Sequence, residues 1–284
     1  MKALLSFAFA SLLYADTLVT GIFHPAQMGT FTPLPQPLEI KSRTVVSLSE
    51  TNDYEKEPPY YHLDYELTTL LILKEIPLNA TSSMTMILPL HRFWGGFMDD
   101  PLDSFHNATG TLHGYRHNEE GKNRLLIDYG PIHQRGSFAT LGDAQIYYKK
   151  RLGSYAIVAS LKLPLHTKSK FFGSKKLAFG AGAIYKKGPL TLNLHITYNP
   201  KVTLAYATTK KLRYFAIASY RYGRWLAEYR FGSSPFHSKV PQFDSISNTL
   251  SLAYSLGAWR FFISENLAPF YNTPDFTIGV NYRF

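Results

Sequence analysis

The chain has 284 residues, which exceeds the usual size of one domain but stays within the range of a single closed β-barrel. Charged residues make up 18% and aromatic residues 15%, a balance that excludes intrinsic disorder, and the absence of cysteine excludes disulfides, thiolate catalysis and cysteine-bound metals. The formal charge of +10 favours polyanionic partners such as nucleic acid, anionic lipid or acidic solutes.

The first fifteen residues have the features of a secretory signal. Lys2 is followed by the uncharged run Ala3 to Tyr14, and Ala15 supplies a small residue before Asp16. We therefore predict a signal peptide over residues 1–15, which also argues against nucleic acid as a partner. A retained helical anchor is the alternative, but the run is shorter than the roughly 20 residues that cross a bilayer as a helix. Residues 16–37 are expected to be a periplasmic or lumen segment.

Most of the remaining chain alternates apolar and polar residues with a period of two. This period is typical of β-strands and not of helices. Thirteen segments follow it, and residues 202–208 form a shorter fourteenth candidate. The segments are Leu38–Ser49, His62–Lys74, Leu78–Leu90, Arg124–Gly130, Asp143–Arg151, Tyr155–Leu163, Leu177–Tyr185, Leu190–Tyr198, Leu212–Tyr222, Trp225–Phe231, Ile246–Leu256, Trp259–Asn266 and Phe276–Phe284.

The lengths of these segments favour a membrane barrel over a soluble sandwich. Many match the 9 to 11 residues of a tilted transmembrane strand and exceed the five or six usual in soluble sheets. Aromatic residues near their ends indicate interfacial girdles; they are Tyr147, Tyr148, Tyr185, Tyr198, Tyr220, Tyr222 and Trp225. We predict an all-β fold, a transmembrane antiparallel up-and-down barrel of about 12 strands (10 to 14 allowed) over residues 38–284. Since such barrels normally have an even number of strands, one of the thirteen assignments is expected to be wrong, and the ambiguity lies before residue 130.

The last strand carries the sharpest local signal. Apolar residues alternate with polar ones from Phe276 to Phe284. This pattern is similar to the C-terminal strand that the barrel assembly machinery of Gram-negative bacteria recognises. We predict an assembly signal at Phe276, Tyr282 and Phe284, and a location in the cell outer membrane. The expected partners are this machinery, outer-membrane lipid and lipopolysaccharide, whose phosphates could meet Lys168, Lys170, Lys175 and Lys176.

An insertion over residues 91–121 interrupts the strand pattern. Asp99, Asp100, Asp103 and His106 together could bind a hard cation or activate a water, but Asp and Gly are also ordinary turn residues. We therefore expect no catalytic residue, no metal and no cofactor. The residues Gly95 to His106 combine apolar and acidic side chains, so we expect them to pack in the barrel interior or mouth, with the acids near Arg213 and Arg221.

Charges on the predicted inner face suggest the function. Cations outnumber acids there, and Arg213, Arg221, Arg230 and Arg260, with the acids above and His106, are the candidates for a lumen constriction. We predict a porin-like passive channel or binding barrel for a small solute, with anions favoured. The alternatives are a closed structural or surface-interaction barrel, whose charges pair across the lumen, and a rim hydrolase that uses Asp99, Asp100, Asp103 and His106.

Four stretches resemble a known family. They are LDYELTT at Leu63–Thr69, GGFMDDPLDSFH at Gly95–His106, SENL at Ser264–Leu267 and TPDFTIGVNYRF at Thr273–Phe284. Together they resemble a set of exported proteobacterial barrels grouped as domain-of-unknown-function family 3187. The resemblance covers most of the chain after residue 15, and residues 107–123 are shorter than the family pattern. It implies a location and an architecture, but no activity.

Overall fold

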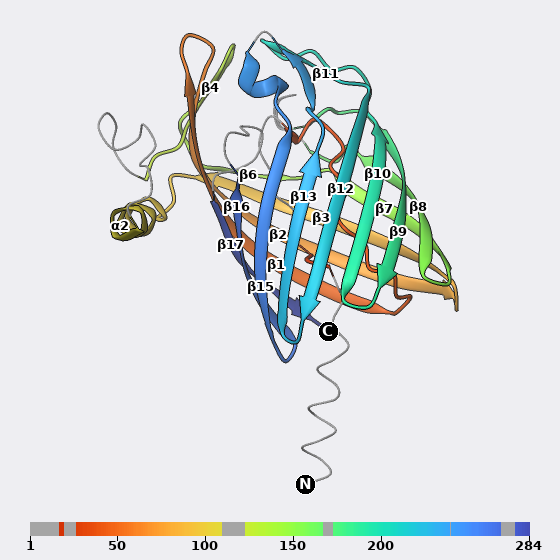
Figure 1. Cartoon of the computed structure of the whole chain (residues 1–284). Helices are drawn as coiled ribbons and strands as arrows, with labels where there is room; N and C mark the ends of the chain where they lie inside the picture. The colour runs from red at the N-terminus through yellow and green to blue at the C-terminus, as the bar shows by residue number, and fades with distance from the viewer. Residues whose placement is uncertain (1–16, 20–26, 110–122, 167–172, 239, 268–275) are drawn as a thin grey trace.

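Twelve antiparallel strands form a closed barrel in the computed structural model (Figure 1). The sheet runs in the order β2-β1-β17-β16-β15-β13-β12-β10-β9-β8-β7-β3, and β2 also pairs with β3, so the strands form a continuous ring. The predicted fold class and strand number are therefore confirmed. The structure describes residues 17–19, 27–109, 123–166, 173–238, 240–267 and 276–284, so the predicted signal peptide lies outside it.

The ring strands and the additional elements are as follows. The ring consists of β1 Arg43–Glu57, β2 Tyr61–Asn79, β3 Ser82–Trp94, β7 Ala144–Leu152, β8 Tyr155–Leu163, β9 Ala178–Lys187, β10 Leu190–Tyr198, β12 Leu212–Tyr222, β13 Trp225–Gly232, β15 Ser247–Leu256, β16 Trp259–Asn266 and β17 Phe276–Arg283. Outside it lie α2 Asp99–Thr109, β4 Leu126–Tyr129, β5 Ile132–Gln134, β6 Phe138–Leu141, β11 Ala207–Thr209, β14 Phe236–Ser238 and the 3-10 helix η4 Pro241–Asp244. Neither helix is long and apolar enough to cross a membrane, nor is any other in the described residues.

The segment predicted over Arg124–Gly130 is not a ring strand. Its core, β4, pairs with residues 61–64 of β2, whereas β3 pairs with β2 only from Glu66 onward. The strand β2 is long enough to project beyond the ring, and β4 pairs with the edge that β3 leaves open. Residues 202–208 are not a ring strand either, because β11 pairs with β14.

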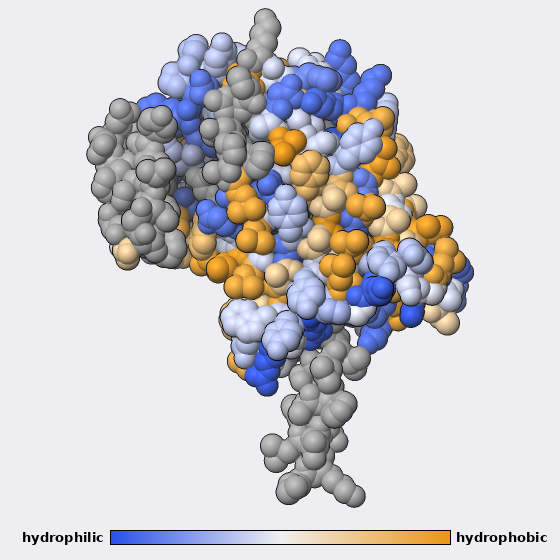
Figure 2. All heavy atoms as spheres, in the orientation of Figure 1, coloured by the Kyte–Doolittle hydropathy of each residue, from blue (hydrophilic) through white to orange (hydrophobic). Residues whose placement is uncertain are grey.

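The outer face of the wall is apolar, and much of its inner face is polar. On β10 the residues Thr191, Asn193, His195 and Thr197 are buried, while Leu194 is 57% exposed. A soluble protein would bury the leucine and expose the polar residues. Figure 2 shows apolar residues gathered across the visible wall. A lumen for the polar face and hydrocarbon for the apolar face satisfy both sides of such a strand.

The two rims of the barrel differ. Two-residue turns with a glycine at positive φ (Gly153, Gly188, Gly223 and Gly257) share one rim with Phe284, and we call it the short-turn rim. Exposed aromatic rings gather there, among them Tyr155, Tyr222, Trp225 and Trp259, and a second group lies toward the opposite rim at Phe179, Tyr198 and Tyr214. Bacterial outer-membrane barrels have short turns at one rim and longer loops at the other, and the two rims of this barrel differ in the same way. Tyr147 differs from the girdle prediction, because its ring is fully buried in the lumen.

Candidate functional site

Residues 27–39, which we call the plug, lie inside the barrel. The first strand begins at Arg43, and nearly all plug residues before Glu39 are buried. Pro33, Pro35 and Pro37 have no N–H group and favour extended backbone in the residues around them. An irregular segment with few donors can be satisfied in a lumen by side chains alone.

Side chains of the wall bind the backbone of the plug. Three amides of the plug donate to side-chain oxygens: Phe31 N to Asn199 Oδ1 at 2.5 Å, Leu34 N to the Tyr147 hydroxyl at 2.8 Å and Gln36 N to Asn193 Oδ1 at 3.0 Å. Carbonyl oxygens of the plug accept from Thr197 Oγ1 and Gln145 Nε2, both at 3.2 Å, and from Lys149 Nζ, at 2.6 Å from Pro37 O and 2.7 Å from Glu39 O. These hydrogen bonds come from β7 and from β10 with the loop after it, whereas apolar residues of β1, β2 and β3 pack against Phe31, Leu34 and Leu38.

Arg213 is fully buried beneath the plug, near the long-loop end of β12. Its acceptors are Thr30 Oγ1 at 2.7 Å, Thr32 Oγ1 at 3.2 Å, Gln27 Oε1 at 3.4 Å and Ser233 O at 3.2 Å. Within the described chain none of these partners is a carboxylate. Neutral oxygens, three of them from the plug, therefore hold this guanidinium.

Arg230 and Arg260 hold a second N-terminal stretch, residues 17–19. Glu228 accepts from Leu18 N at 3.0 Å and pairs with Arg230 at 2.6 Å, and Arg230 also donates to Leu18 O at 3.2 Å. Arg260 donates to Thr17 O at 2.8 Å. Three of the four predicted lumen arginines thus contact the N-terminal segment.

A buried ion-pair cluster lies at the base of the plug. The Glu75 carboxylate pairs with Arg43 at 2.8 Å and with Lys149 at 2.9 Å, and Ser83 Oγ donates to it at 2.7 Å. Lys149 also binds the plug backbone, so the cluster joins β1, β2, β7 and the plug. Arg43 and Glu75 are register partners, and β3 lies between β2 and β7, so the cluster lies along one stretch of the wall and does not cross the lumen.

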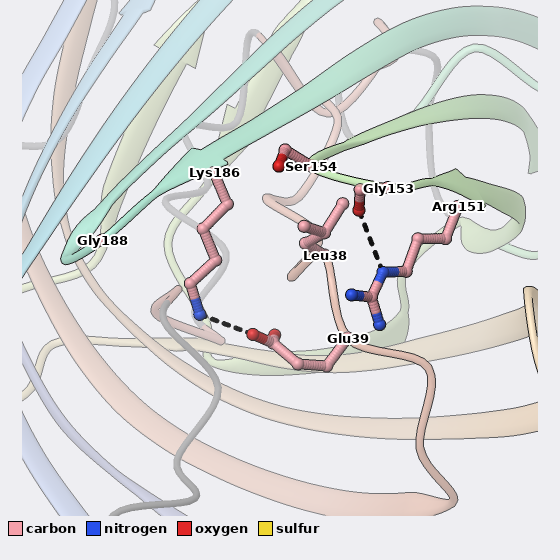
Figure 3. A pocket seen from close by; sticks show the side chains of 7 residues that line it. All are labelled: Leu38, Glu39, Arg151, Gly153, Ser154, Lys186 and Gly188. Carbon is pink, nitrogen blue, oxygen red and sulfur yellow. Dashed lines mark hydrogen bonds and ion pairs between the residues drawn. The ribbon is translucent and has the colours of Figure 1, made fainter.

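At the short-turn rim, the end of the plug near Glu39 lies beside an open pocket (Figure 3). This pocket has a volume of about 500 Å³ and is lined by Leu38, Glu39, Arg151, Gly153, Ser154, Lys186 and Gly188. Glu39 pairs with Lys186 at 2.5 Å, and both side chains are partly exposed. Arg221, the fourth predicted arginine, is also near this rim and donates to Gly223 O at 3.2 Å.

An apolar cluster lies on the long-loop side of the barrel. It joins the inner face of the projecting β2–β4 ribbon to β11, β14 and η4. Its larger buried members are Tyr61, Tyr65, Phe93, Tyr129, Phe236 and Phe243, and Met28 of the plug packs against it. The plug therefore contacts both the polar wall and the external loops.

The segment Gly95–His106 is ordered against the barrel, but on its outer face. Asp99 accepts from Asn52 Nδ2 at 3.0 Å and Glu66 accepts from Met98 N at 2.5 Å. Asn52 and Glu66 are register partners on β1 and β2. Each lies an even number of positions from an exposed residue of its own strand, Leu48 or Ile72, so both point outward. In Figure 1, α2 accordingly lies beside the wall.

The expectation that this segment fills the lumen is therefore wrong, because polar residues on the outside of β1 and β2 bind it above the apolar belt. Asp100 is exposed and Asp103 half-buried on the same helix, and the His106 side chain lies outside the described residues. The acids do not meet Arg213, which binds the plug, and Arg221 lies near the opposite rim. No group of three or more His, Asp or Glu able to hold a metal occurs in the part of the chain that the structure describes.

The sequence reasoning missed the residues that bind the plug. Tyr147, Asn193 and Asn199 look like ordinary inward or girdle residues, and only their contacts reveal a role. One signal was present, since prolines at every second position from 33 to 37 predict an extended segment that cannot join a sheet.

Comparison with known proteins supports this architecture. No family model and no curated protein matches the chain. Among solved structures it is similar to the COG4313 outer membrane channel from Pseudomonas putida F1, with a TM-score of 0.52 and 14% identity over 88% of this chain and 96% of that chain. The chain has an outer-membrane barrel fold. At this identity the likeness concerns the fold alone.

Two further similarities are weaker. Outer membrane phospholipase A from Escherichia coli has a TM-score of 0.45 and 9% identity, over 85% of this chain and 95% of that one. Salmonella typhi OmpF in complex with daunomycin has a TM-score of 0.37 and 8% identity, over 86% of this chain and 97% of that one.

Proposed function

We propose that this barrel is a passive outer-membrane channel for small solutes, with anions favoured, and that the plug narrows its lumen. The observation that carries the proposal is that the lumen contains the plug, a segment that is not a strand of the wall. Side chains of the wall bind the plug, and it takes no part in the backbone hydrogen bonds between the ring strands. Because the ring closes without the plug, the plug can leave and the wall remains intact.

The proposal includes a location, partners and a family. The chain, after removal of residues 1–15, lies in the outer membrane of a Gram-negative cell, where the assembly machinery inserts it and lipopolysaccharide surrounds it. Membership of domain-of-unknown-function family 3187 is supported by the quoted stretches, of which Leu63–Thr69 lies in β2 and Thr273–Phe284 contains β17. Lys175 and Lys176 lie in a long loop, on the side where lipopolysaccharide is expected.

A closed structural barrel is the second candidate. The cluster of Arg43, Glu75 and Lys149 favours it, because paired buried charges join three strands and the plug. The two candidates differ in whether ions ever cross the lumen.

Conductance in planar lipid bilayers distinguishes them. We expect the full chain to conduct in rare, small openings, and a variant that lacks residues 17–38 to conduct steadily with a larger unit conductance. Deletion of α2, which lies on the outer face, is the matched control and should leave the unit conductance unchanged. Heat-modifiable migration on gels verifies that each variant is a folded barrel. A folded variant without residues 17–38 that does not conduct would establish the closed barrel instead.

A further inference from the structure

The environment of Arg213 is unusual for a buried guanidinium. Arginine has five N–H donors and cannot lose its charge, so a buried one normally pairs with a carboxylate or a phosphate. Here the charge lies in a lumen and its acceptors are two hydroxyls, one side-chain amide and one carbonyl. The hydrogen bonds are satisfied while the charge remains without a counter-ion among them.

Three of these four acceptors belong to the plug and one to the wall. Thr30 and Thr32 face Nη1 and Gln27 faces Nη2, while Ser233 O, after β13, accepts from Nε and Nη2. Departure of the plug therefore removes acceptors from both terminal nitrogens. Those two nitrogens form the fork that binds two oxygens of one anion.

The neighbouring arginines are in a different situation. Arg230 pairs with Glu228 whether or not Leu18 is present, so its charge is already balanced. Thr197, the register partner of Arg213, is neutral, and so is Asn199 beyond it; both bind Phe31. When the plug leaves, the site around Arg213 keeps its positive charge and loses the neutral oxygens that now face the guanidinium.

We propose that Arg213 is an anion-binding site in the lumen that the plug occupies in cis, so that a small carboxylate or phosphate and the plug compete for it. The inference rests on the proposed channel function. The plug hydroxyls and amide oxygen stand where the oxygens of an anion would bind. Since only the unplugged state offers this site, an anion that binds there shifts the barrel toward that state.

The test uses the full chain in planar bilayers, with inorganic phosphate added to a chloride electrolyte. Phosphate should raise the open probability several-fold. Arg213→Gln should be more open without phosphate, because the plug loses its anchor, and should not respond to phosphate. Asn193→Ala is the matched control. It loses the bond to the Gln36 amide, so it should also be more open at rest, but it keeps Arg213 and should still respond to phosphate.

A second variant covers a failure of Arg213→Gln to fold. Arg213→Lys keeps the charge but not the fork, so the phosphate concentration for half-maximal opening should rise about tenfold. Equal phosphate responses in wild type and in the Arg213 variants, or no response in a conducting wild type, overturn the inference and leave the channel proposal standing. Absence of conductance in every folded variant, including the one without residues 17–38, overturns the channel proposal itself.

Discussion

The effect of replacing a charged side chain in the lumen depends on how far that charge and its partners are removed from water. Glu75 is buried between two cations, so replacing its carboxylate leaves Arg43 and Lys149 as uncompensated buried neighbours. Glu39 and Lys186 form a pair of the same chemistry at the rim, where both side chains are partly hydrated. The two pairs therefore separate the effect of burial from that of ion pairing.

Glu75→Gln should destabilise the barrel far more than Glu39→Gln. Breaking a buried pair costs about 3 kcal/mol or more of unfolding free energy, whereas loss of an exposed pair changes it by about 1 kcal/mol or less. Urea unfolding followed by tryptophan fluorescence, with heat-modifiable migration as a second readout, measures both. Equal midpoints for the two variants would contradict the assigned role of Glu75.

Asp128 provides a test of electrostatics outside the ring. Asp128 lies in the β4–β5 hairpin, where hydrogen bonds from Arg135 hold the pKa of its carboxyl below its usual range. The hydrogen bond with His133 lowers this pKa further, while partial burial acts in the opposite direction. A carboxyl whose pKa is lower in the folded state than in the unfolded state stabilises the fold when it is ionised. This stabilisation is fully present above the unfolded pKa of about 3.9 and is lost as the pH falls through the folded pKa. The carboxyl-carbon NMR shift should thus titrate below about pH 3.9. In Arg135→Gln the midpoint should move up toward that value, and an unchanged midpoint would exclude Arg135 as the cause.

Strands differ in how well the alternation of residues predicts them. On β10 the polar face meets the lumen and the apolar face meets lipid, so its boundaries and orientation follow from sequence alone. On β2 both faces are apolar, since Leu70 and Ile72 face outward while Leu71 and Leu73 face the plug. Polarity could not orient that strand without knowledge of the plug.

The lumen arginines show the same limit. The alternation along the strands predicts that Arg213, Arg230 and Arg260 point inward, but it does not predict which residues they bind. The bond from Arg213 to Thr30 joins residues 183 positions apart, and the plug has no periodicity that fixes its place. The acids of Gly95–His106 were misplaced because composition cannot tell an inner wall from an outer face above the membrane.

The strand β17 closes the ring, and its loss should prevent a barrel from forming. It pairs with β16 on one side and β1 on the other, so deletion of residues 276–284 leaves two open edges. We expect no heat-modifiable form of this variant in the outer membrane. Deletion of β4 and β5, which lie outside the ring, is the control and should leave a heat-modifiable barrel. Normal insertion without residues 276–284 would refute the role of this strand.

The whole barrel can be tested by fixing the plug in place. The chain has no cysteine, so a cysteine pair introduced at Gln36 and Asn193 can be cross-linked by oxidation or a short bis-maleimide without background; the backbone nitrogen of Gln36 lies 3.0 Å from Asn193 Oδ1. Cross-linked protein should not conduct at all, and reduction of the disulfide form should restore its openings. Each single-cysteine variant, treated identically, is the control. Conductance that persists in fully cross-linked protein would show that ions bypass the plug.

The position of the plug in the chain has a consequence for biogenesis. Residues 27–39 directly precede β1, and β1 is the strand to which β17 pairs when the ring closes. The segment is covalently attached at the seam between the first and last strands, so we expect closure of the seam to enclose it without a later threading step. A newly inserted molecule should then carry the plug from the start, and new copies of the protein should add no wide path across the membrane.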